Sequence, residues 1–320
     1  MALDVSTLVD YVIENENLLV SRSLFSGRTV DLINAEGNVM TGVKFAEQIN
    51  VLSTDAIFQD GSGCTRTASG TTSLTQRKVT VGQIAVVEDL CVKTLNKKYM
   101  SKKLAAGSLA EKQKIPFEKE YTDLKAGTIA EQLEVAIWQG DTSHGNANLN
   151  RFDGYIKLID AASGVVNGNN TSITTATGIT QSNVVSIINN QIARIPARVQ
   201  GKADIRIFVG WDVFSNYVAA LTAANMYHYI ASEDATKEDV GTLIIPGSYI
   251  KLTAVHGLDG TNRIFTMRTS NMFLGTDMAD EEEKWEIIPD QFKNYLRFNT
   301  EFKYGVNFAF PDEIVSFKLV

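Results

Sequence analysis

One stretch of the chain has a composition that cannot form a hydrophobic core by itself. Strand-like runs at Ile49–Leu52 and Lys78–Val87 flank a centre, residues 60–73, that is rich in Gly, Ser and Thr. A segment this polar buries too little apolar surface to fold alone. The pattern predicts two long strands that leave a globular body and return to it, joined by a flexible tip.

The strongest helical pattern runs from Phe117 to Gln139, directly after Pro116. Apolar residues recur there at steps of three to five, which is typical of a helix that packs along one side. Acidic residues lie in its first turns, where the helix dipole favours negative charge. We expect a helix of about 33 Å. The apolar stripe comprises Tyr121, Leu124, Ile129, Leu133, Ala136 and Ile137.

Three further elements are expected in the N-terminal third. Apolar positions within residues 5–24 favour a partly exposed helix. Gly27–Ile33 is expected to form a short strand that ends at a turn over residues 36–38. Val86–Leu104 favours a helix, which carries a lysine cluster at Lys97, Lys98, Lys102 and Lys103.

Beyond residue 160 the pattern alternates between helix and strand. Ser163–Ser182 is expected to be a loop or ragged hairpin, and a helix capped by Ser182 follows to Ile195. A buried strand at Ile205–Val209 and a helix at Trp211–Met226 complete an α/β or α+β unit. The remainder is rich in strands, with turns expected at Gly257–Gly260, Ser270-Asn271, Tyr304-Gly305 and Phe310–Asp312.

Composition limits the classes of function. The chain has 320 residues, 44% of them hydrophobic, so it can bury a sizeable core in one large domain or two ordinary ones. Its net charge of −7 argues against a dedicated DNA-wrapping protein, because phosphate neutralisation needs clustered Lys and Arg. A protein whose inner surface merely faces DNA stays possible. No signal peptide or membrane span is indicated, so we expect a soluble protein that is cytoplasmic at synthesis.

Residues that could carry chemistry are scattered. His144, His228 and His256 have no second ligand at metal spacing, so they are interpreted as structural or surface residues. Cys64 and Cys91 lack the spacing of a zinc site or redox pair, and we expect two free thiols. No phosphate-binding loop or nucleophile elbow is present. The sequence therefore predicts no catalytic residue, no cofactor and no metal, and the protein is not expected to be an enzyme.

Two charged clusters admit alternative interpretations. The acidic run Asp277–Glu286 could bind a divalent cation weakly, but it lacks the glycine and spacing of a calcium loop, so a solvated acidic face is favoured. The lysine cluster could touch phosphate or the acidic groups of a neighbouring subunit, and a solvated helix face is again the simpler interpretation.

Several phrases of the chain resemble the major capsid proteins of tailed double-stranded-DNA phages, whose fold is named for the phage Hong Kong 97. They look most similar to those of large phages of Bacteroidetes-type hosts. Each phrase is short, and their order along the chain carries the resemblance. The phrases are Val79–Leu95, Glu131–Asp141, Phe152–Asp160 and Tyr304–Val315.

The resemblance implies an α+β fold in five parts. Residues 1–43 would be an N-terminal arm, 44–92 an extended E-loop hairpin, and 93–160 a peripheral domain around the spine helix 117–139. Residues 161–275 would form an axial domain, and 276–320 would return as strands to the peripheral domain.

The resemblance also implies function and partners. The chain would assemble into hexamers and pentamers of an icosahedral head shell, with a separate scaffolding protein, a portal and decoration proteins as further partners. Packaged DNA would face the inner surface without sequence-specific binding, and no membrane would be involved. The alternative is another virion protein such as a tail tube subunit. Charged residues expected at contacts between subunits are Arg66, Arg77, Lys78, Lys97, Lys98, Glu118 and Glu120.

Overall fold

The computed structural model describes residues 27–60, 62, 67–91, 117–169, 178–224, 240–277, 284–290 and 295–319. The helix expected within residues 5–24 and the lysine cluster of residues 97–103 lie outside these ranges, as do Cys64 and His228. None of the described helices is both long and apolar enough to cross a bilayer.

The first sheet is built around the long strand β12, Tyr295–Phe308. Along one edge β12 pairs antiparallel with β4, Gly82–Cys91. Along the other it pairs antiparallel with β11 (Lys284–Asp290) and then with β10 (Met272–Thr276). Strand β1, Val39–Thr41, adds to β10 in parallel. Residues far apart in sequence thus share one sheet.

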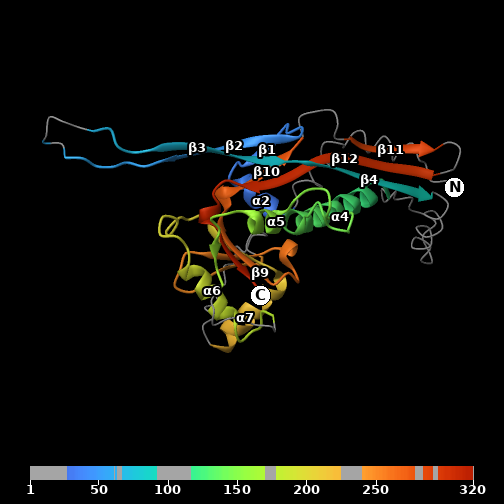
Figure 1. The fold of residues 1–320 in the computed structure, drawn as a ribbon. Helices are drawn as coiled ribbons and strands as arrows, with labels where there is room; N and C mark the ends of the chain where they lie inside the picture. The colour runs from blue at the N-terminus through green and yellow to red at the C-terminus, as the bar shows by residue number, and fades with distance from the viewer. Residues whose placement is uncertain are drawn as a thin grey trace.

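Helix α4, Phe117–Gln139, lies along this sheet (Figure 1). Its boundaries are as expected, and its 23 residues span about 35 Å. Ile129, Leu133 and Ile137 are buried in the apolar cluster that also holds aromatic residues of β12. Leu124 was expected in the buried stripe but is 66% exposed, because the stripe that meets the sheet runs through Ala126 and Ile129 instead.

The second sheet has six strands in the order β5-β13-β9-β6-β8-β7. The strand expected at Ile205–Val209 is confirmed as β6, and helix α7, Trp211–Ala223, follows it. The other helix of this lobe, α6, covers Val184–Ala193. The remaining strands are β5 (Val166–Asn167), β7 (Thr242–Ile244), β8 (Lys251–Ala254), β9 (Arg263–Arg268) and β13 (Val315–Lys318).

A single tryptophan joins the two lobes. Trp138, near the end of α4, is fully buried, and its ring lies 5.3 Å from Phe208 of β6 and 5.8 Å from Phe265 of β9. The ring also lies 5.3 Å from Tyr155 of helix α5, Tyr155–Ala161. The helix of the first lobe and the sheet of the second therefore share one core.

Glu134 lies one turn before Trp138 and is the acid buried in the same region. Its carboxylate accepts hydrogen bonds from the Thr29 main-chain N–H (3.2 and 3.3 Å) and from the Thr29 hydroxyl. The Trp138 indole N–H donates to that hydroxyl oxygen at 2.8 Å. Burial raises the pKa of Glu134 to about 7, although the Thr29 hydrogen bonds act in the opposite direction.

This carboxylate explains why an expected strand is a helix. Gly27–Ile33 was predicted as a strand, and the prediction is wrong because residues Arg28–Ala35 form helix α2. Val30 and Ile33 bury one side of α2. The Glu134 carboxylate supplies the acceptor that the first main-chain N–H groups of a helix need. The turn after it is confirmed at residues 36–37.

Strands β2 (Ala46–Thr54) and β3 (Thr72–Thr80) form the arm, a two-stranded antiparallel ribbon. Figure 1 shows β2 and β3 projecting from the body, away from the other two sheets. The two projecting strands are therefore confirmed, but the second begins earlier than predicted, at Thr72, and ends earlier, at Thr80. The run Lys78–Val87 is divided at Val81, because Ile84 and Val86 belong to β4 and pair with β12.

Three other local predictions differ from the structure. Residues 86–91 were expected to begin a helix and instead complete β4. Ser182 does not cap α6, whose N-cap is Asn183 without a side-chain cap hydrogen bond. His256, expected in a strand, begins a short 3-10 helix, His256–Leu258. The turns expected around Gly257–Gly260, Ser270-Asn271 and Phe310–Asp312 are present.

The turn expected at Tyr304-Gly305 is also wrong, since β12 runs straight through it. A Cβ atom on Gly305 would lie 2.2 Å from the carbonyl oxygen of Thr80. The glycine is needed because the root of the arm passes against β12, a common reason for glycine inside a strand.

Substituting Gly305→Ala should therefore strain the arm root. We expect a loss of about 1–3 kcal/mol in the free energy of unfolding, measured by urea denaturation. Gly145→Ala is the matched control, because a Cβ there meets nothing within 4 Å. Equal stability of the two variants would contradict the close approach.

Glu134 should make stability depend on pH. An acid whose pKa is higher in the folded than in the unfolded chain stabilises fully below its unfolded pKa of about 4.5, and that stability is lost as pH rises towards 7. The free energy of unfolding of the unmodified protein should fall by about 3 kcal/mol between pH 4.5 and 8, and this fall should be absent in Glu134→Gln. Urea unfolding across this range tests it, with Glu131→Gln, exposed on the same helix, as the control.

Candidate assembly surfaces

The arm is anchored at its root and exposes several large apolar side chains among polar ones. Ile49, Val51 and Val79 are buried against Ala309, which follows β12. The outer half of the ribbon is exposed on both faces. Large apolar side chains are exposed along and beside it: Phe45 (81%), Leu52 (64%), Leu74 (62%), Ile57 (57%) and Phe58 (98%).

Two of the residues expected at contacts between subunits lie at this root. The Arg77 guanidinium lies 4.1 Å from the centre of the Phe308 ring, and its half-burial lowers the Arg77 pKa. The Lys78 side chain is exposed, while its carbonyl accepts a hydrogen bond from Asn307 at 2.5 Å. Arg77 thus already binds its own chain, and the contact role of both residues stays a prediction.

The remaining expected contact residues cannot be placed by their side chains. Glu118 and Glu120 lie in the first turn of α4, but only their main chain is described. Arg66, Lys97 and Lys98 fall outside the described residues. The structure therefore does not bring these seven residues together as one site.

The tip of the arm is held in shape by polar contacts across it. The Asp55 carboxylate accepts a hydrogen bond from the Thr71 main-chain N–H, and the Gln59 amide donates to the Thr67 carbonyl and the Ser69 hydroxyl. Hydrogen bonds from the Ser62 hydroxyl (2.6 Å) and N–H (2.9 Å) hold the pKa of Asp60 below its usual value. The tip therefore presents two carboxylates beside Ile57 and Phe58.

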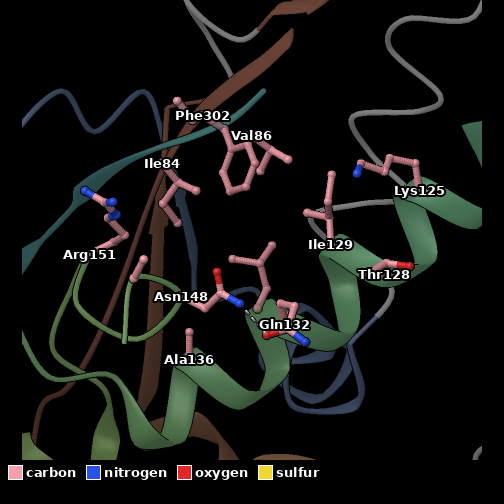
Figure 2. A pocket seen from close by; sticks show the side chains of 13 residues that line it. Ile84, Val86, Lys125, Thr128, Ile129, Gln132, Ala136, Asn148, Arg151 and Phe302 are labelled. Carbon is pink, nitrogen blue, oxygen red and sulfur yellow. Dashed lines mark hydrogen bonds between the residues drawn. The ribbon is translucent and has the colours of Figure 1, made fainter. Parts of the chain in front are cut away.

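A groove of about 240 Å³ lies between α4, β4 and β12. Figure 2 shows Ile84, Val86 and Phe302 on one wall and Ile129 of α4 facing them. Polar groups line the rim, where the Asn148 amide donates to Gln132 at 3.1 Å. The groove thus combines an apolar interior with a polar edge, the usual make-up of a binding site.

Charge at the groove rim is unevenly balanced. Lys125 forms an ion pair with Glu88, whereas Arg151 forms no ion pair with any described residue. The loop that carries Arg151 is held by Lys157, whose ammonium lies 2.7 Å from both Asp141 and Asp153. The hydrogen bond from Lys157 is the main cause of a lowered pKa at Asp141.

The second lobe also exposes apolar side chains. Tyr249 is 93% exposed and Ile244 54% exposed, and both lie beside β7, the edge strand of the six-stranded sheet. Sequence reasoning identified neither these residues, nor Phe58, nor the groove. The signal for Phe58 was present, since an Ile57-Phe58 pair in so polar a stretch has no local partner to bury it.

Groups that could carry chemistry remain dispersed among the described residues. His144 accepts a hydrogen bond from the Asn146 N–H, and exposed His256 stacks on Trp211 and binds Asp259 at 2.9 Å. Asp277, at the start of the acidic run, pairs with Lys303 at 2.8 Å, while residues 278–283 are outside the described ranges. No group of three or more potential metal ligands occurs within the described part of the chain.

The chain is similar to known proteins in its fold and not in its sequence. No protein-family model and no curated protein sequence matches the chain. A solved structure of the satellite phage P4 procapsid, which includes the size determination (Sid) protein, matches with a TM-score of 0.57 and 12% identity, over 91% of this chain and 90% of that one. The capsid of the Myoviridae phage XM1 matches with a TM-score of 0.55 and 13% identity, over 90% and 92%.

A chain of Gordonia phage Cozz is similar to the same degree, with a TM-score of 0.55 and 10% identity, over 90% of this chain and 86% of that one. The similarity covers about nine-tenths of this chain rather than one shared motif. At such low identity it establishes the architecture alone: the chain has the α+β fold of tailed-phage major capsid proteins.

Proposed function

We propose that this chain is a major capsid protein, which self-assembles into hexamers and pentamers of an icosahedral shell that encloses phage double-stranded DNA. The observation that carries the proposal is the arm. It projects from a body with a capsid fold and exposes large apolar side chains that no described part of the same chain covers.

Physical chemistry supports this interpretation of the arm. A two-stranded ribbon by itself is at best marginally stable in water. Apolar groups gathered on a projection are typical of a surface that another molecule covers. When copies of one chain close into rings, each subunit can cover the arm of the next, so that every arm is buried once.

The five-part organisation belongs to this proposal. Residues 1–43 would be the N-terminal arm, 44–92 the E-loop region that contains the projecting ribbon, and 93–160 the peripheral domain with its spine helix. Residues 161–275 would be the axial domain and 276–320 the returning strands. A second apolar cluster under α6 and α7, beside the core that both lobes share, supports a division between peripheral and axial parts.

Partners and location follow from the same proposal. The protein would reside in the virion after synthesis in the host cytoplasm, in contact with a separate scaffolding protein, a portal and decoration proteins. A net charge of −7 argues against DNA wrapping, and the inner surface would face the packaged DNA without sequence-specific binding. No catalytic role is proposed. The host would be of the Bacteroidetes type, because the sequence resembles capsid proteins of phages that infect such hosts.

Electron microscopy and light scattering of the purified full-length protein, alone and with a candidate scaffolding protein, test the function. We expect closed shells, or rings of five and six subunits. Stacked hollow tubes of uniform six-fold rings would identify a tail tube subunit instead. A compact monomer under every condition would contradict the proposal.

Shortening the arm should separate folding from assembly. Thr54 and Thr72 are paired neighbours in the ribbon, so an Asn-Gly turn can replace residues 55–71 without changing the register. We expect this variant to keep its circular dichroism and urea midpoint, because the body does not depend on the tip, but to lose shells. Shells formed at the unmodified yield would contradict the role of the tip.

A further inference from the structure

The arm tip carries a large apolar side chain, Phe58, that is exposed and could be buried in another molecule. Phe58 is 98% exposed, the most exposed of the large apolar side chains in the described part of the chain. Exposing a whole aromatic ring to water is unfavourable, and its burial stabilises a contact strongly. The cross-strand bonds of Asp55 and Gln59 fix the main chain on either side of it.

The groove between α4, β4 and β12 has the size and chemistry to receive this ring. Its volume of about 240 Å³ exceeds the roughly 150 Å³ that suffices for benzene in an apolar cavity. Ile84, Val86 and Phe302 offer aliphatic and aromatic contacts. The groove opens to solvent, so a side chain can enter without unfolding the body.

The charges of the tip and of the groove rim are opposite in sign. Asp55 and Asp60 lie on either side of Phe58, and their carboxylates are at the exposed tip. Arg151 stands at the groove rim without an ion pair among the described residues. A ring seated between Ile84 and Ile129 would bring an acidic flank of the tip towards this guanidinium, a pairing for which arginine is well suited.

The groove that receives the tip must belong to another molecule. Strand β3 runs from the tip towards the body, and β4 continues away from the arm to Ile84 (Figure 1). Thr72 and Ile84 are thus separated by about 40 Å of extended chain, and Phe58 lies beyond Thr72. The tip cannot fold back to its own groove while the ribbon is intact.

We propose that Phe58 of one subunit inserts into the groove between α4, β4 and β12 of a second copy of the chain, with Arg151 of that copy facing Asp60. This inference rests on the proposed function, which requires the arm to contact a neighbour, and it names the receiving site. Residues of four separate segments of the chain form that site.

Photo-cross-linking of the full-length protein tests the contact directly. In a Phe58→p-benzoylphenylalanine variant, irradiation should join the tip to a second chain within residues 84–86, 125–136 or 302, as mapped by mass spectrometry. A Tyr249→p-benzoylphenylalanine variant, equally exposed on the other lobe, is the control and should not label these residues. Cross-links from residue 58 that map elsewhere, or none at all, overturn the inference.

A charge exchange supplies the second measurement. Asp60→Arg should raise the subunit concentration needed for assembly by about tenfold, the effect of a single contact worth one ion pair in a partly dry interface. Adding Arg151→Glu should restore it, whereas adding Lys202→Glu, exposed on the second lobe, should not. Failure of the Arg151 exchange to restore assembly would overturn the pairing.

The two proposals fail in different ways. Shells that form normally while residue 58 labels another surface leave the capsid function in place and remove the groove as the receiving site. A protein that never forms shells or rings loses the proposed function, and labelling of the groove in such a protein would still establish the contact between copies.

Discussion

The hydrogen-bonded group formed by Trp138, Glu134 and Thr29 is the point on which the body depends. Trp138 and Glu134 lie in α4 and Thr29 lies in α2, so the indole ring meets the six-stranded sheet while the carboxylate holds the start of α2. Helix α2 leads directly into β1 and the arm. Because one buried cluster joins both lobes and the root of the arm, the relative position of these parts is set by core packing rather than by surface contacts.

Large apolar side chains are stabilised by burial, and the interior and the surface of the molecule differ in how far they achieve it. Inside the body, large side chains pack within the chain, and the buried Tyr155 hydroxyl donates to the Phe273 carbonyl at 3.1 Å. On the arm and beside β7, several large apolar side chains remain mostly exposed to solvent. The single chain is thus a complete fold with an incomplete surface, which copies of itself can complete.

Sequence reasoning succeeded where the determining contacts are local. The helix Phe117–Gln139 and the strand Ile205–Val209 follow from periodicity, and both are present. It failed where a distant group decides. Helix α2 depends on Glu134, more than a hundred residues away, and Gly305 faces the Thr80 carbonyl rather than a turn. The groove could not be predicted, because its residues come from segments that only the fold brings together.

The groove and the arm of one subunit are physically adjoining. Arg151 stands at the groove rim, and its carbonyl oxygen lies where a Cβ on Gly82 would be, at 1.9 Å. Gly82 begins β4, just beyond the point where the arm leaves the body. An occupant that displaces the Arg151 main chain therefore presses on the base of the arm of the same subunit. The groove rim and the base of the arm are thus packed directly against each other, because the close approach of the Gly82 and Arg151 main chains leaves no room for a side chain between them.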